Sequence, residues 1–581
     1  MDDALETTEV LLIDCQTTGA SPARGRLLEL AWARTTAAAV ATSSDLVATV
    51  RPMSRLVSLP EGETLSRRIT ALTGIDKAAM SAAVPAKTVW QDLSAVVDVM
   101  REAPSSADEV PTVIHFARFE EPFLRELHAA QAGEGARFPF ELICTHAMAL
   151  ALLPTLPRKG LRALAGYLGY VMGERKRAGD HVIATAVVWS ELVSRAAEAG
   201  VRDLGGLRAW LAETAAIARP PRKGPRSFPL DRRLRLSLPA EPGVYRMLAR
   251  GGRVLYVGKA TSLQRRVNSY FQKRRHDRGE RTLELLTQVR DVDVTVTASP
   301  LEAALLESDE IKRLAPPYNK ALRDDGAAWF ATIDGADAAP GVDDAHPLGP
   351  LPDARSLDGL GTIAAHVASG GRPPRSVADS RIFGFASRDQ LDADCLAAGL
   401  RLFCERNGLR IARASSFAPL IRLDAAFWRR DVLAVADGPD ADSPDAGDER
   451  PWDPDRVAAA LEGVVRTEAR LLRRAHLLCQ LTESCVAYRA AGAAPRLLVI
   501  EGGAVREAVD VEEHRRLPAP PGRGRRWSER QALFDGATYD RLRVLVTELK
   551  RLVSEGATVA VSLGSMAPLG QSALARRLRW V

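Results

Sequence analysis

Cysteine is scarce in this sequence of 581 residues, and the few cysteines are scattered. No two of them have the Cys-x-x-Cys spacing of a zinc or redox site. Although Cys395 and Cys404 lie only nine positions apart, the close cluster that holds an iron–sulfur centre is missing, so we expect no such cluster. We interpret all six as thiols in a reducing compartment, namely Cys15, Cys144, Cys395, Cys404, Cys479 and Cys485.

Long hydrophobic runs are also missing. No stretch of about 18 uninterrupted apolar residues is present, which excludes a membrane-spanning helix of the usual length. The first ten residues, MDDALETTEV, are acidic where a signal peptide needs a basic start and an apolar stretch. We therefore expect a cytoplasmic protein, associated with the nucleoid and without a membrane partner.

Positive charge is concentrated in one segment. The chain has a formal net charge of +6 and a pI of about 9.0. Residues 222–330 contain 22 Lys+Arg against 13 Asp+Glu, a net charge of +9, and the rest of the chain has a net charge of −3. A basic segment of this kind favours a polyanionic partner, and we expect DNA.

The length suggests several domains, and Pro-rich or charged stretches indicate where they meet. ARPPRKGPRSFP (218–229) is a basic linker and ADGPDADSPDAGDERPWDPD (436–455) an acidic one. These stretches predict domains over 1–217, 236–325, 326–435 and 456–581, with linkers over 218–235 and 436–455.

Local patterns predict several elements. VLLID (10–14) is typical of a buried strand that ends in a carboxylate. GVYRML and RVLYVG, joined by Ala-Arg-Gly-Gly, predict a β-hairpin, and LLVIEGGAVREAV predicts another over Gly502-Gly503. The remaining expectations are a strand over 558–563 and helices over 92–103, 181–200, 301–314, 456–481 and 538–553.

The basic segment contains an ordered set of polar residues. Gly243-Val244-Tyr245 is followed by Tyr256-Val257-Gly258, and LLESDEIKRLAPPYN (305–319) closes the set. Over about 90 contiguous residues the segment resembles the GIY-YIG nuclease family, in the form seen in excinuclease ABC. The resemblance implies a DNA endonuclease whose catalytic residues are Tyr245, Tyr256, Lys259, Arg266, Tyr270, Glu307 and Asn319.

The resemblance also implies a role for each group. Glu307 would hold one Mg²⁺ or Mn²⁺ ion, which acts as a Lewis acid at the leaving oxygen. Tyr245 is the candidate general base, and positive charge from Lys259 and the metal would have to lower its pKa from about 10. Arg266 is suited to clamp a phosphate oxygen. Gly258 would let the backbone approach closely before a helix begins at about Leu263. The excess of positive charge over 222–330, rather than the resemblance, leads us to expect DNA contacts at Arg265, Lys273, Arg274 and Arg275.

Residues 8–200 resemble a second family. LLIDCQTTGA (11–20), VIHFARFEEPFL (113–124) and RAGDHVIATA (177–186) are similar to motifs of the DEDD exonucleases, in the form of the epsilon subunit of DNA polymerase III. The resemblance implies a mixed sheet flanked by helices, as in ribonuclease H. We therefore expect a multidomain α/β protein: a ribonuclease H-like exonuclease fold, a small α/β GIY-YIG domain, and an α+β C-terminal region.

The exonuclease motifs are degenerate. The family uses four carboxylates to hold two metal ions and a histidine as base. Here the first motif reads Asp14-x-Gln16, the second has Glu120, and Lys176 and His181 take the positions of the base and the last aspartate. Asp180 could replace that aspartate only after a local shift. We expect a catalytically silent domain that binds DNA or a partner.

Three functions remain open at this stage. The leading hypothesis is a structure- or damage-directed endonuclease of nucleotide excision repair, working with excinuclease damage-recognition subunits. One alternative is a 3′–5′ exonuclease associated with a DNA polymerase, and another is a non-catalytic DNA-binding scaffold. Residues 326–581 contain no motif that we recognise, and we expect the 456–481 helix to pack in a core.

Overall fold

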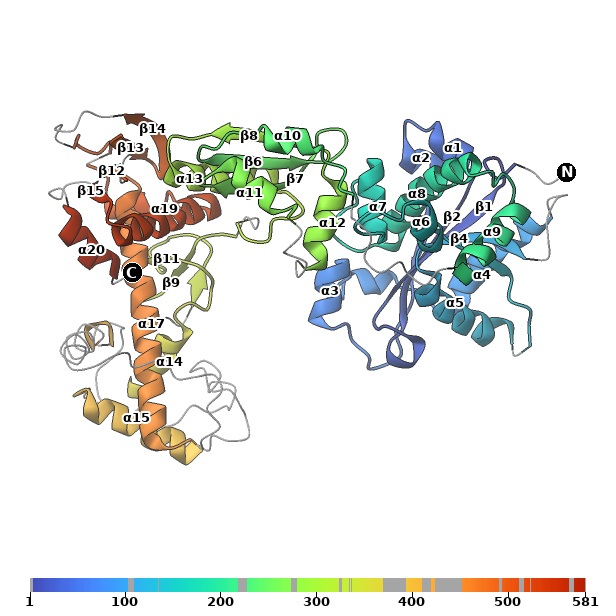
Figure 1. The fold of residues 1–581 in the computed structure, drawn as a ribbon. Helices are drawn as coiled ribbons and strands as arrows, with labels where there is room; N and C mark the ends of the chain where they lie inside the picture. The colour runs from blue at the N-terminus through green and yellow to red at the C-terminus, as the bar shows by residue number, and fades with distance from the viewer. Residues whose placement is uncertain are drawn as a thin grey trace. The chain divides into compact units, whose positions relative to one another are not determined.

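The structure is a computed structural model (Figure 1). It describes residues 4–102, 109–133, 135–217, 227–272, 279–322, 326–333, 335, 337–368, 393–409, 420–423, 452–490, 494–510, 517–522, 524–563 and 569–579. The chain divides into two compact units, Met1–Pro300 with Pro316–Lys320, and Leu301–Ala315 with Ala321–Val581. No helix among these residues is long and apolar enough to cross a membrane.

The first unit contains a mixed five-stranded sheet with the order β3-β2-β1-β4-β5. β1 pairs antiparallel with β2 and parallel with β4, which agrees with the mixed sheet expected from the sequence. The strands are β1 (Val10–Thr17), β2 (Leu27–Thr35), β3 (Met53–Leu56), β4 (Val110–Ile114) and β5 (Phe140–Cys144).

Helices pack against both faces of this sheet because β1 is apolar on both faces. Its Leu12 packs in a core with α6 (Thr145–Leu152), α7 (Leu161–Leu168) and α8 (Ala178–Glu198). Its Ile13 packs in a second core with α4 (Ala86–Arg101) and α5 (Ala117–Ala132). Smaller helices complete this region: α1 (Ala37–Ala41), α2 (Leu46–Val50), α3 (Arg67–Thr73), α9 (Leu204–Ile217) and the 3₁₀ turns Pro22–Arg24 and Ala79–Ala82.

The end predicted for the first strand is wrong. β1 continues to Thr17 because its pairing with β2 extends past Asp14, with Asp14 opposite Ala31 and Gln16 opposite Glu29. Side chains alternate along a strand, so Asp14 and Gln16 lie on the same face as Leu12, the face that α8 covers. This register brings both polar groups to α8.

The first unit also contains a separate three-stranded sheet of order β7-β6-β8. The predicted hairpin is confirmed: β6 (Gly243–Leu248) and β7 (Val254–Ala260) are antiparallel, and Gly251 and Gly252 have φ of 86° and 82°. The sheet is completed by β8 (Asp291–Val296), with α11 (Leu263–Ser269) and α12 (Glu280–Gln288) in its core cluster.

One helix falls inside the stretch predicted as the basic linker. α10 (Arg232–Leu236) begins there because the Asp231 side chain caps it, accepting a hydrogen bond from the backbone N–H of Arg233 at 2.7 Å. The prediction of a linker over the whole of 218–235 is therefore wrong at its C-terminal end, while residues 218–226 lie outside the described residues.

The second unit begins with α13 (Pro300–Leu314), whose Leu301 and Leu305 are buried in its core. Two antiparallel sheets follow, β10-β9-β11 and β14-β13-β12-β15. Their strands are β9 (Trp329–Ala331), β10 (Ala338–Ala339), β11 (Leu348–Leu351), β12 (Ser484–Arg489), β13 (Arg496–Glu501), β14 (Ala504–Asp510) and β15 (Thr558–Leu563). The helices are α14 (Asp358–Ala368), α15 (Ala393–Arg406), α17 (Pro454–Leu481), α18 (Trp527–Gln531), α19 (Gly536–Ser554) and α20 (Gln571–Arg579).

The long helix α17 packs as expected. Its N-terminal half, including Leu461, is buried in a core with α14 and α15, and its C-terminal half, including Leu478, in the core of the four-stranded sheet. The predicted acidic linker ends too late, because Asp453 caps this helix by accepting from the N–H of Arg456 at 2.8 Å. The part of that linker over 436–451 lies outside the described residues.

Candidate functional site

Three tyrosines of the basic segment form one cluster, the tyrosine cluster (Tyr245, Tyr256 and Tyr270). Tyr245 is fully buried on β6, and its ring centroid lies 6.1 Å from that of Tyr256 and 6.2 Å from that of Tyr270. The hydroxyl oxygens of Tyr245 and Tyr270 are 2.9 Å apart, a hydrogen-bonding distance. The sheet and α11 therefore hold two phenols in direct contact.

Gly258 is required by this cluster. It lies opposite Tyr245 in the β6–β7 register, and a Cβ atom there would come within 2.5 Å of the Tyr245 hydroxyl and 2.9 Å of the Tyr256 ring. The glycine thus makes room for two tyrosine rings. The predicted helix start at Leu263 is confirmed.

The electrostatics of Tyr245 differ from what was expected. Burial raises its pKa well above the usual value, and the neighbouring phenols of Tyr270 and Tyr256 add to that rise. The positive charge of Arg266 lowers the pKa, with the guanidinium 5.3 Å from the Tyr270 ring centroid. The expectation that Lys259 and a bound metal ion lower this pKa stays a prediction; in the protein itself burial dominates, and the positive charge that opposes it belongs to Arg266. Tyr245 is a neutral phenol at neutral pH.

Asn319 holds the backbone of β7. Its Oδ1 accepts from the N–H of Val257, and its Nδ2 donates to the carbonyl oxygen of Val257, both at 2.9 Å. The side chain is buried. It therefore positions the strand that contains Tyr256 and Lys259, and its own polar atoms are engaged.

Glu307 lies on α13 in the second compact unit and is partly exposed. Ion pairs hold this helix within its unit, because Glu302 bonds Arg496 at 2.9 Å and Lys312 bonds Asp540 at 3.0 Å. One partly exposed carboxylate fits a hard cation that keeps most of its water ligands, such as Mg²⁺.

The predicted DNA-binding residues are only partly described. Arg265 is exposed on α11, in the first turn after the cap Ser262. Lys273, Arg274 and Arg275 lie outside the described residues.

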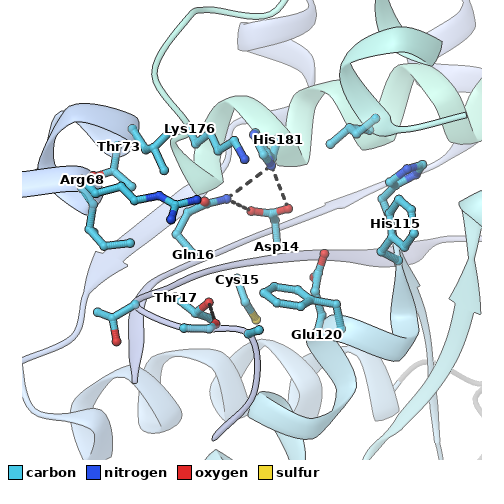
Figure 2. Close-up of a pocket in the computed structure, with 18 of the residues that line it drawn as sticks. Asp14, Cys15, Gln16, Thr17, Arg68, Thr73, His115, Glu120, Lys176 and His181 are labelled. Carbon is cyan, nitrogen blue, oxygen red and sulfur yellow. Dashed lines mark hydrogen bonds and ion pairs between the residues drawn. The ribbon is translucent and has the colours of Figure 1, made fainter. Parts of the chain in front are cut away.

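The five residues of the exonuclease-like motifs, Asp14, Gln16, Glu120, Lys176 and His181, all line one cavity of about 920 Å³, the N-terminal cavity (Figure 2). β1 supplies the first two, α5 supplies Glu120, and the start of α8 supplies His181. The fold thus brings these residues, up to 167 positions apart in the chain, to one cavity.

Protein nitrogens contact both oxygens of Asp14. Gln16 Nε2 donates to Asp14 Oδ2 at 2.8 Å, and His181 Nδ1 lies 3.1 Å from Asp14 Oδ1, as the dashed lines in Figure 2 show. Gln16 Nε2 is also 3.3 Å from His181 Nδ1, which closes a triangle of contacts. The amide and the imidazole thus stand where a metal-holding site would need anionic ligands.

Two further polar groups of the cavity are buried. Burial raises the pKa of Glu120, with Asp14 adding to the rise, and its Oε2 has no hydrogen-bond partner among the described residues. Burial lowers the pKa of His115 to about 3, so this imidazole is neutral at physiological pH. Its Nδ1 lies 2.9 Å from the hydroxyl of Thr145.

The donor set of this cavity does not fit two divalent ions. Among the described residues, no group of three or more His, Cys, Asp or Glu side chains is arranged to hold a metal ion. Asp180 is not a replacement, because its oxygens accept from the Tyr170 hydroxyl at 2.5 Å and the Gly173 N–H at 3.0 Å. We derive no metal-dependent step at this cavity.

Sequence reasoning missed several residues of the cavity. His115 and the partly exposed Phe116 and Phe119 belong to the string VIHFARFEEPFL, of which only Glu120 was singled out. Their position directly after the β4 strand was the available signal. Arg68 is contributed by α3, and no local pattern indicates that this helix lies beside the cavity.

The basic segment is similar to known proteins. Residues 241–320 match the family described as the UvrC-like GIY-YIG domain. The chain is 54% identical over 88 residues to UvrABC system protein C of Legionella pneumophila, a match that covers 15% of this chain and 14% of the relative. It is 46% identical over 99 residues to the Neisseria gonorrhoeae protein of the same name, a match that covers 17% of this chain and 16% of that relative. The chain thus spans about a seventh of the length of these relatives.

Solved structures of two kinds match parts of the chain. The GIY-YIG N-terminal endonuclease domain of UvrC from Thermotoga maritima, bound to magnesium, is 31% identical, with 15% of this chain and 94% of that one covered and a TM-score of 0.14. The nuclease domain of 3′hExo, a DEDDh family member bound to rAMP, is 12% identical to this chain. The match covers 33% of this chain and 92% of that one, with a TM-score of 0.26.

Proposed function

We propose that residues 236–325 form a metal-dependent DNA endonuclease that hydrolyses phosphodiester bonds in nucleotide excision repair. The observation that carries this proposal is the hydrogen-bonded pair Tyr245 and Tyr270 packed over Gly258, within the segment that matches the UvrC-like domain. Identity of 46 to 54% to UvrABC system protein C over this segment supports excision repair as the process. Excinuclease damage-recognition subunits are the partners that we propose, acting on DNA in the cytoplasm.

The residues of the site have distinct tasks in this proposal. Tyr245 accepts the proton of the attacking water, so its phenolate must form in a buried position. Arg266 stabilises that phenolate, since it lowers the pKa of Tyr245, and Tyr270 shares a hydrogen bond with it. A divalent ion held by Glu307, when bound, supplies Lewis-acid stabilisation of the leaving oxygen.

The phosphate is positioned by the remaining groups. Arg266 and Lys259 provide positive charge beside the tyrosine cluster, and Arg265 extends it along α11. Asn319 acts indirectly, because its two hydrogen bonds to Val257 fix the strand from which Tyr256 and Lys259 project. The net charge of +9 over 222–330 supports DNA as the ligand.

We propose that the N-terminal domain binds DNA or a partner without cutting. The hydrogen bonds of Gln16 and His181 to Asp14 argue against the alternative of a 3′–5′ exonuclease, because they occupy the oxygens that a metal would need.

The proposal is tested by incubating the full chain with Mg²⁺ and two DNAs. One is an end-labelled single strand, and the other is a lesion-bearing duplex, with and without the damage-recognition subunits. A discrete internal cut in the duplex supports the proposal. A ladder of shortened single strands would instead indicate an exonuclease, and binding without cleavage a scaffold.

A further inference from the structure

Helix α13, which contains Glu307, turns one of its sides to the rest of the second unit. Leu301 and Leu305 are buried in the core of the four-stranded sheet. Glu302 and Lys312 form ion pairs with residues of β13 and α19. These positions follow the spacing of successive helical turns and lie along one side of the helix. The second unit therefore fixes how α13 is rotated about its own axis.

The ion pair between Glu302 and Arg496 is bidentate and poorly exposed. Arg496 Nε donates to Glu302 Oε1 at 2.9 Å, and Arg496 Nη2 donates to Glu302 Oε2 at 3.0 Å. The hydroxyl of Tyr488 also donates to Glu302 Oε1, at 2.9 Å. The Arg496 and Glu302 side chains are 12% and 15% exposed, so little water competes for these hydrogen bonds. Residues of β12 and β13 thus hold the first turn of α13.

A second set of contacts holds the C-terminal half of α13 to α19 (Figure 1). Lys312 forms an ion pair with Asp540 at 3.0 Å, and the two side chains are 8% and 15% exposed. Asp309 accepts from Arg541 at 2.7 Å, and Arg541 also donates to the carbonyl oxygen of Gly503 at 3.1 Å. Helix α13 is therefore fixed at both of its ends.

Glu307 lies on the side of α13 that faces away from these contacts. It follows Leu305 at the second position along the chain, which is a turn of about 200° around a helix. Any rotation or slide of α13 that displaced this carboxylate would pull Glu302 and Lys312 from their partners. Unpaired charges would then remain in poorly exposed positions, which is strongly unfavourable. The contacts on one side of the helix thus determine where the Glu307 carboxylate is held.

We propose that the C-terminal region positions the metal-binding carboxylate, with Arg496 and Asp540 as its positioning residues. Both act through Glu302 and Lys312 of α13, and not by contact with the metal ion or with DNA. Because Glu307 is the one protein ligand that we expect, the affinity for the metal ion depends on how firmly this side chain is placed. The region over 326–581 thereby gains a role in cleavage. The inference rests on the proposed function, since it takes Glu307 as the metal ligand.

The inference is tested by titrating the full chain with Mn²⁺ in the absence of DNA, at a temperature where every variant is folded. Electron paramagnetic resonance measures the free ion, and a parallel titration of Glu307→Ala identifies the binding that depends on Glu307. We expect Arg496→Met to weaken this binding at least about tenfold, the lower end of the usual effect of residues that hold a metal ligand in place. A variant that is only less stable would keep its affinity at this temperature.

Arg551→Met is the matched control. Arg551 pairs with Glu548 and Glu555 within α19, both at 2.8 Å, so its loss perturbs α19 without removing an ion pair of α13. The Mn²⁺ affinity of this variant should equal that of the native chain. An equal loss of affinity in Arg551→Met and Arg496→Met would overturn the inference, because affinity would then follow the general integrity of the unit.

Arg496→Lys keeps the test decisive if Arg496→Met does not fold. Lysine retains the charge but not the bidentate geometry, so we expect a smaller loss of Mn²⁺ affinity. Hydrogen exchange over 300–314, measured without metal, should rise in Arg496→Met and rise less in Arg496→Lys. This second measurement reports how firmly α13 is held, independently of any bound ion.

The outcomes separate this inference from the proposed function. Native Mn²⁺ affinity in folded Arg496→Met, or in Arg496→Lys where Arg496→Met does not fold, would overturn the inference and leave the proposed function intact. Equal Mn²⁺ binding by the native chain and Glu307→Ala would overturn the metal assignment of the proposed function, and this inference with it.

Discussion

The hydroxyl oxygens of Tyr245 and Tyr270 lie 2.9 Å apart, and Tyr245 itself is fully buried. A buried phenol that must lose its proton depends on Arg266, whose positive charge lowers the pKa of Tyr245. We predict that Tyr245→Phe lowers the rate of DNA cleavage by about 10²–10⁴, the range for loss of a general base. Tyr270→Phe should give a smaller loss, since it removes only the partner.

Single-turnover cleavage of a lesion-bearing duplex measures both effects. Tyr318→Phe is a matched control, because this buried tyrosine of the same segment bonds Glu284 at 2.7 Å and lies outside the tyrosine cluster. It should lower the melting temperature without a comparable loss in rate. If Tyr245→Phe cuts as fast as the native chain, Tyr245 is not the base.

Gly258→Ala should damage the site by crowding. The new methyl group would lie 2.5 Å from the Tyr245 hydroxyl and 2.6 Å from its Cζ, so the ring must shift. We expect a destabilisation of about 1–3 kcal/mol, as for other overpacked cores, together with a loss of cleavage. Thermal unfolding and cleavage are measured on the same preparation.

Gly279→Ala serves as the control for the glycine substitution. A Cβ there meets no atom within 4 Å, and the residue caps α12, where the change costs at most about 1 kcal/mol. In the Gly258→Ala background, Tyr245→Phe removes the closest clash and should restore part of the stability but no activity. Native stability and activity in Gly258→Ala would show that the close approach is not required.

Local patterns in the sequence were sufficient for much of the fold. Glycines that adopt positive φ at the turns indicate the hairpins over Gly251-Gly252 and Gly502-Gly503. Apolar residues that recur at helical spacing over a long stretch indicate α17. The predicted ends of the two linkers were less accurate, because a capping side chain can start a helix within a stretch that has the composition of a linker. Asp231 and Asp453 each start a helix inside a stretch whose composition indicated a linker.

The chemistry of the N-terminal cavity required the structure. The sequence indicated that His181 replaces an aspartate, but not that it and Gln16 both bond Asp14, because the partners are up to 167 positions apart. It left Asp180 as a replacement ligand, whereas Tyr170 engages that carboxylate. The pKa of Tyr245 depends on burial, which no local pattern contains.

The N-terminal domain should lack 3′–5′ exonuclease activity. The test uses the full chain with Glu307→Ala and a 5′-end-labelled single strand, in Mg²⁺ and in Mn²⁺. We expect no shortening, because Gln16 and His181 contact both oxygens of Asp14, and a lysine, Lys176, stands where the family has its histidine base. Processive shortening at about 1 s⁻¹ or faster, as is typical of enzymes, would contradict this expectation.

Restoring the motif residues provides the positive control for that experiment. Gln16→Glu, Lys176→His and His181→Asp together should create or raise exonuclease activity if the cavity has the geometry of the family. A folded triple variant that stays inactive in both metals would show that more than these three positions has diverged.

A pH-sensitive contact is expected in the second unit. Glu468 of α17 accepts hydrogen bonds from the N–H groups of Gly359 and Leu360, and burial raises its pKa to about 7. A carboxyl whose pKa is raised on folding contributes stability below its unfolded value of 4.5, and this contribution is lost as the pH rises through 7. Its size is on the order of 1–3 kcal/mol.

The melting temperature of the native chain and of Glu468→Gln is compared between pH 4.5 and 8. The substitution should flatten the fall in stability over this window, since the amide does not titrate. Thr467→Ala, at the neighbouring exposed position, controls for changes in the helix itself. Parallel pH profiles for the native chain and Glu468→Gln would exclude Glu468 as the titrating group.

We propose that residues 236–325 cut DNA with a metal ion held by Glu307. The most direct measurement is the rate at which Glu307→Ala cleaves a lesion-bearing duplex in Mg²⁺, with DNA affinity measured in parallel. We predict a loss of at least about 10²–10³ in rate with binding largely retained. Cleavage by Glu307→Ala at the native rate would contradict the claim.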